Sequence, residues 1–70
     1  MAREDGPGAG GTFLTAAEVT SCLAALRYTQ IRPILIDDGK WEVKARNPRG
    51  QRVELYVDAR TCVILREERD

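Results

Sequence analysis

Apolar residues recur with helical spacing in the first half of the chain. Thr15 and Glu18 match the capping box, in which the Thr hydroxyl accepts the backbone N–H of the Glu and the Glu side chain reaches back to the cap. We therefore expect a helix over residues 16–27. A helix of about three turns is not stable alone and must pack against another element. Its apolar stripe consists of Ala16, Val19, Leu23 and Leu26, with Cys22 at its edge.

Beyond this helix the pattern changes to alternation with a period of two, which is typical of strands with one buried face. Asp38-Gly39 is a strong signal for a two-residue hairpin turn of type I′. This turn pairs Ile36 with Trp41 and Ile34 with Val43, so the apolar residues of both strands lie on one face. Turn chemistry and hydrophobic pattern therefore predict the same register.

A second turn is indicated by the segment 47–50, where Pro48 suits the second position of a type I turn and Gly50 suits the left-handed position that follows. The resulting loop pairs Asn47 with Gln51 and again places the apolar residues on one face. A third turn over 58–62 leads to a short last strand over 63–65. The expected core is the helical stripe together with Ile34, Ile36, Trp41, Val43, Val53, Leu55 and Val57.

These elements predict an α+β fold, with one N-terminal helix packed on a three- to four-stranded antiparallel meander sheet. We expect a flexible Gly-rich tail over residues 1–12, the domain over 13–66 and a frayed C-terminus over 67–70. No element is left to cover the second face of the sheet. The candidate partner-binding residues on that face are Leu35, Glu42, Lys44, Glu54 and Tyr56, and the first two form one row with Tyr56.

Composition narrows the function classes. The 70 residues suffice for one small domain, and 11 Lys and Arg balance 11 Asp and Glu, which argues against a nucleic-acid binder. The absence of His removes His-ligated metals and His-activated nucleophiles. No apolar run approaches the ~18 residues that a membrane-spanning helix needs. We therefore expect no enzyme, no catalytic residue, no cofactor, no metal and no membrane insertion.

The two cysteines, Cys22 and Cys62, are either free thiols or one disulfide. A disulfide requires Cα atoms within ~7 Å of each other. Because Cys22 is expected beneath the sheet while the turn that carries Cys62 lies at its rim, we expect two free thiols. The charged start at residues 1–5 does not resemble a secretory signal.

In chain order, the segment 41–45, Gly50, the segment 53–58 and Arg60-Thr61 resemble the PepSY domain. That family has an aromatic-Glu-Val strand, a turn with Gly, a strand that ends in Val-Asp, and a Thr-Gly turn into a short strand. The resemblance spans about residues 13–66. One departure is Cys62, which stands where the family has Gly and would be strained if the position requires a positive φ.

PepSY domains occur in propeptides of thermolysin-like metallopeptidases and as small stand-alone exported bacterial proteins. The resemblance implies a non-catalytic module that binds a protein, with a peptidase as the partner that it inhibits or regulates through the open sheet face or an edge strand. It also implies a periplasmic or secreted location, whereas the residues themselves leave a cytoplasmic one open. The alternative is a structural domain that self-associates as a homodimer through the open face.

Overall fold

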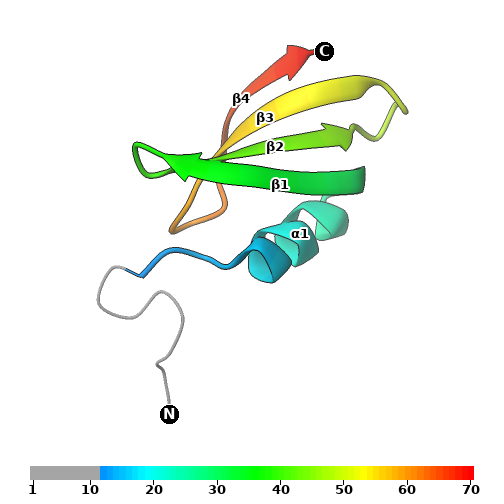
Figure 1. Cartoon of the computed structure of the whole chain (residues 1–70). Helices are drawn as coiled ribbons and strands as arrows, with labels where there is room; N and C mark the ends of the chain where they lie inside the picture. The colour runs from blue at the N-terminus through cyan, green and yellow to red at the C-terminus, as the bar shows by residue number, and fades with distance from the viewer. Residues whose placement is uncertain (1–11) are drawn as a thin grey trace.

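A computed structural model describes residues 12–70 of the chain. Helix α1 (Ala16–Ala25) is followed by strands β1 (Thr29–Asp37), β2 (Lys40–Arg46), β3 (Arg52–Asp58) and β4 (Ile64–Arg69). The strands form one antiparallel sheet in the order β1-β2-β3-β4, and α1 lies against one of its faces (Figure 1). The predicted α+β fold is confirmed, with four strands. The tail expected over residues 1–12 lies outside the described residues except for Thr12.

Both ends of α1 are capped by the chain itself. The predicted capping box is present, because Glu18 N–H donates to Thr15 Oγ1 over 3.1 Å and Thr15 N–H donates to Glu18 Oε1 over 2.8 Å. The helix ends earlier than predicted, in a Schellman motif with Arg27 in the left-handed region at φ 75°. A residue with this φ cannot continue a right-handed helix.

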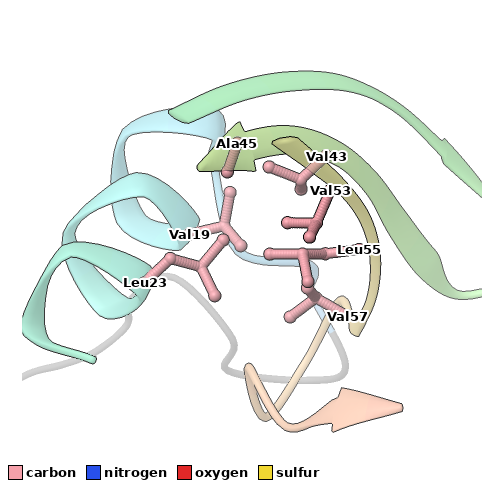
Figure 2. Packing of buried hydrophobic residues seen from close by; sticks show 7 residues of the cluster. All are labelled: Val19, Leu23, Val43, Ala45, Val53, Leu55 and Val57. Atoms are coloured by element: carbon pink, nitrogen blue, oxygen red, sulfur yellow. The ribbon is translucent and has the colours of Figure 1, made fainter. Parts of the chain in front are cut away.

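The core lies between α1 and the two central strands (Figure 2). The helical stripe is narrower than predicted, since only Val19 and Leu23 are buried while Ala16 and Leu26 are exposed. Leu26 follows the last helical residue, at the point where the chain turns into β1. Trp41 is half-buried and packs against this cluster. The buried side chains of the cluster are Val19, Leu23, Val43, Ala45, Val53, Leu55 and Val57.

Strand β1 departs from the predicted register at its centre. Ile36 pairs with Trp41 as expected, but Val43 lies opposite Pro33 rather than Ile34. The register shifts between Pro33 and Leu35, which adds a residue to β1, and Ile34 is 47% exposed. The prediction of Ile34 as a core residue was therefore wrong.

Both hairpin turns have the predicted geometry. Asp38 and Gly39 have φ values of 54° and 73°, as a type I′ turn requires. Asn47 pairs with Gln51 through a 2.9 Å backbone hydrogen bond, and Gly50 has a φ of 79°. The Asn47 side chain also accepts the backbone N–H of Gln51, over 3.0 Å. These turns fix the register of β2 against its two neighbours.

The C-terminal end of the chain differs most from expectation. Strand β4 pairs with β3 as far as Arg69, beyond the predicted end at residue 65 and into the segment 67–70 that we expected to fray. Cys22 and Cys62 form a disulfide with Cα atoms 6.7 Å apart, which corrects the expectation of two free thiols. The reason is that the β3–β4 turn lies against the segment leading into α1, where Leu14 N–H donates to Ala59 O over 2.7 Å.

Candidate functional site

The sheet face opposite α1, here called the outer face, is not covered by any element within residues 12–70 (Figure 1). Its residues form rows across the strands. Leu35 lies opposite Glu42, and Glu42 lies opposite Tyr56, which is the row expected from the sequence. In the next row Lys44 lies opposite Glu54. The structure thus places all the candidate partner-binding residues on one face.

One end of the outer face carries apolar and aromatic side chains. Leu35 is 44% exposed and Leu65 is 53% exposed. A register shift in β4 leaves Leu65 without a paired residue on β3. This places Leu65 on a shallow hollow of about 400 Å³ together with Tyr56, Lys40 and Arg66. Sequence analysis missed the contribution of Leu65, although three consecutive apolar residues at 63–65 are a break in the alternation that could have indicated a bulge.

The other end of the outer face is basic and lies where β2 runs into the 47–50 turn. It contains a second hollow, of about 270 Å³. Lys44 forms an ion pair with Asp70 in this region, with 3.8 Å between Nζ and Oδ2. Of the basic residues here, only Lys44 was among the candidate partner-binding residues. The hollow is lined by Gln30, Arg32, Lys44, Ala45, Arg46, Arg52, Val53 and Asp70.

Tyr56 is held in its neutral form on this face. Its pKa is raised above the ordinary value by burial and then by the negative charges of Glu54, Glu68 and Glu42, against which Arg66 acts. A neutral phenol can donate a hydrogen bond to a ligand. No described side chain forms a hydrogen bond with Tyr56 that would activate it as a nucleophile.

Two further groups with shifted pKa values have structural roles. Burial, a hydrogen bond to the Glu67 carboxylate and the charge of that carboxylate raise the pKa of Tyr28 to about 12. The pKa of Asp58 is lowered, because Asp58 Oδ1 accepts the backbone N–H groups of Arg60 and Thr61 over 2.8 and 3.0 Å. The Asp58 carboxylate therefore holds the turn that carries the disulfide.

Residues 12–70 contain no group of three or more His, Cys, Asp and Glu side chains that could hold a metal ion. In that range, α1 is not long and apolar enough to cross a membrane.

Comparison with known proteins identifies a family but no individual relative. No curated protein and no solved structure matches the chain. The model of one family, described as the peptidase propeptide and YPEB domain, matches residues 1–68 of the 70. This match covers α1 to β3 in full and β4 as far as residue 68, and it confirms the resemblance inferred from the strand and turn residues. The chain therefore belongs to the PepSY family of peptidase propeptide and YPEB domains.

Proposed function

We propose that this domain, a peptidase-propeptide-like module by family, binds a peptidase without itself being catalytic and regulates it through the outer face. The family supports a peptidase as the class of partner. The uncovered outer face supports this surface as the proposed place of contact.

The observation that carries this proposal is the presence of the exposed Leu35 and Leu65 and the half-buried Tyr56 on a face that no element within residues 12–70 covers. Protein interfaces combine an apolar and aromatic centre with a polar rim, and a few such residues supply most of the binding energy. Here Glu42 lies between Leu35 and Tyr56, and Lys40 and Arg66 border the hollow beside Tyr56. The chemistry of this face is therefore that of a docking surface rather than of a reaction centre.

Binding by strand addition to a sheet edge is less well supported than binding to the outer face. The edge strand β1 has two register shifts and contains Pro33, which cannot donate to an added strand. The other edge strand, β4, has a charged stretch at 66–69 and its own register shift. Such features protect natural sheet edges against pairing. Both edge strands are therefore poor sites for strand addition, and the outer face is the better supported place of binding.

The proposed location is outside the cytoplasm, in the periplasm or secreted. Disulfides persist in oxidising compartments and are rare in the cytosol. The Cys22–Cys62 disulfide therefore agrees with the exported location that is typical of PepSY domains.

The test measures cleavage of a fluorogenic peptide by a purified thermolysin-like metallopeptidase in the presence of the oxidised domain. We expect the wild-type domain to lower the rate, and Leu35→Ser combined with Tyr56→Ser to weaken this effect at least tenfold. The matched control is Leu26→Ser, which removes an exposed apolar side chain at the C-terminal end of α1, away from the outer face. Neither binding nor inhibition by the wild type at ~100 µM, or an equal loss in the control, would contradict the proposal.

Light scattering separates this function from self-association. A monomer of 7.8 kDa is expected. If the particle instead has twice this mass, and the change at Leu35 and Tyr56 returns it to the monomer, the outer face is the contact between two copies of the domain. That result would replace the peptidase with a second chain as the partner.

A further inference from the structure

We propose that the basic hollow on the outer face binds a short acidic peptide segment of the partner protein. This inference rests on the proposed function, because it names the chemistry of the partner at that same face. It can nevertheless be tested with a peptide alone.

The basic residues of this hollow are paired with one another across the strands, in a way that does not favour sheet stability. Arg32 lies directly opposite Lys44, and Arg46 lies directly opposite Arg52. Like charges in directly opposed cross-strand positions destabilise a sheet. Two such pairs lie side by side on one hollow in a chain whose formal net charge is zero. Local violations of this kind are expected where a surface serves binding rather than folding.

Charges within residues 12–70 neutralise this group only in part, since Lys44 lies opposite Glu54 and forms an ion pair with Asp70. Neither Arg32 nor Arg52 forms an ion pair with another residue in the range 12–70, and both side chains are exposed. Lys44 has Asp70 as a neighbour, but the 3.8 Å separation is long and both side chains are partly exposed. Two guanidinium groups thus remain available to an incoming carboxylate, which they can bind in a bidentate manner.

The position of Arg46 is fixed before any ligand arrives. Its Nε donates to Gln30 Oε1 over 3.1 Å, and its Nη1 donates to the Gly50 carbonyl over 2.7 Å. Gln30 lies in the left-handed region at φ 49°, within the register shift between Thr29 and Arg32. Such a conformation is costly for a residue other than Gly and is found where it directs a side chain to a purpose. Here it places the Gln30 amide beside the Arg46 guanidinium, at the edge of the hollow.

The size of the hollow and its surroundings favour a short acidic peptide over a long polyanion. A volume of about 270 Å³ accommodates one or two acidic side chains. The row that begins with Arg32 and Lys44 continues across the sheet to Glu54 and then Glu68. These carboxylates would repel a nucleic acid that extended beyond the hollow, whereas a peptide can place neutral or basic residues against them.

The experiment measures fluorescence anisotropy of a labelled octapeptide that carries four aspartates, with an otherwise identical asparagine peptide as the reference. We expect the oxidised full chain to bind the acidic peptide only, and binding to weaken at least tenfold when NaCl rises from ~50 to ~500 mM. Arg32→Gln combined with Arg52→Gln should weaken binding at least fivefold. Asp70→Asn removes the acidic side chain of the hollow and should tighten it about twofold.

The matched control is Arg27→Gln combined with Arg60→Gln, which removes the same charge from residues that line neither hollow of the outer face and should leave peptide binding unchanged. The Arg32 and Arg52 variant should also melt about 2–4 °C higher than the wild type, because it removes one cation from each like-charged pair. A merely structural role of these residues would lower both binding and melting temperature.

Several outcomes would overturn the inference. These are no peptide binding at ~1 mM, equal weakening in the control variant, a lower melting temperature in the Arg32 and Arg52 variant, or tighter binding of a single-stranded oligonucleotide than of the acidic peptide. If the peptide fails while peptidase regulation through Leu35 and Tyr56 persists, only this inference is lost. If the peptide binds and the peptidase is unaffected, the proposed function is lost and the acidic-peptide site remains.

Discussion

Trp41 donates its indole N–H to the carbonyl oxygen of Leu14 over 2.9 Å. The N–H of the same Leu14 donates to the Ala59 carbonyl, so one residue is bonded to both β2 and the β3–β4 turn. Trp41 also packs against the buried core cluster, on the face of the sheet that α1 covers. Its role thus combines the core packing expected from the sequence with a polar contact that positions the start of α1.

Trp41→Phe keeps an aromatic ring but removes the N–H donor. We expect it to lower the free energy of unfolding by about 1–2 kcal/mol, from the lost hydrogen bond and part of the ring packing. Urea titration followed by circular dichroism measures the change. Tyr56→Phe is the control, because it removes a hydroxyl on the outer face and should change the stability by less than ~0.5 kcal/mol. Equal stability of the two variants would show that the contact with Leu14 is not formed in solution.

Replacing both cysteines tests the disulfide. The bridge joins residues separated by 40 positions, and the chain-entropy model assigns about 4 kcal/mol to closing a loop of this length. Cys22→Ser combined with Cys62→Ser should therefore remove a large part of the stability of a domain of this size. The difference in melting temperature between this variant and the wild type measures the loss of stability. Alkylation of the denatured wild type without reductant should give no label, and two labels would show free thiols instead.

The conformation of Cys62 permits a second and independent test. Its φ is 67°, in the region that favours glycine. In a background with Cys22→Ala, we expect Cys62→Gly to be more stable than Cys62→Ala by about 1 kcal/mol. Both variants lack the disulfide, so their urea midpoints report only the backbone. An Ala variant that equals or exceeds the Gly variant would show that the turn does not need a left-handed residue.

The contact between Tyr28 and Glu67 predicts a dependence on high pH. The folded-state pKa of Tyr28 is about 12, above the ordinary value near 10. Because folding favours the neutral phenol, the stabilisation is fully present below pH ~10 and is lost as the pH rises toward 12. In a Tyr56→Phe background, the ultraviolet absorbance of the single remaining tyrosine reports its titration directly.

Glu67→Gln is the matched change for this titration. It keeps an oxygen that can accept from the phenol but removes the negative charge, so the pKa of Tyr28 should fall part of the way toward its ordinary value. Burial, the largest cause, should keep it from falling all the way. A titration unchanged by Glu67→Gln would contradict the contact.

Turn chemistry made most of the fold predictable. Asp38-Gly39 and the 47–50 turn each fix a register, and each register places apolar residues on the same face. The row from Leu35 to Tyr56 follows from these two turns alone. That is why the outer face could be predicted from the sequence.

The remaining features of the fold cannot be predicted from the alternation of apolar and polar residues. The extra residue at Ile34 shifts the register within β1, and the unpaired Leu65 shifts it within β4. No turn residue indicates either shift. The basic hollow was missed in part for this reason, since Arg32 comes opposite Lys44 only because of the register shift between Pro33 and Leu35. The disulfide depends on how α1 lies along the sheet, and local sequence rules do not fix that placement.

The link between Cys22 and Cys62 makes the segment 22–62 a closed ring, and this ring contains both hairpin turns and the whole of β1, β2 and β3. Hydrolysis of any one peptide bond inside the ring therefore leaves two fragments that remain covalently joined. A cut at the exposed residues 48–50 would add the mass of one water without releasing either piece. For a domain whose proposed partner is a peptidase, this means that a first cleavage need not destroy the module. The two fragments would separate only after the disulfide had been reduced.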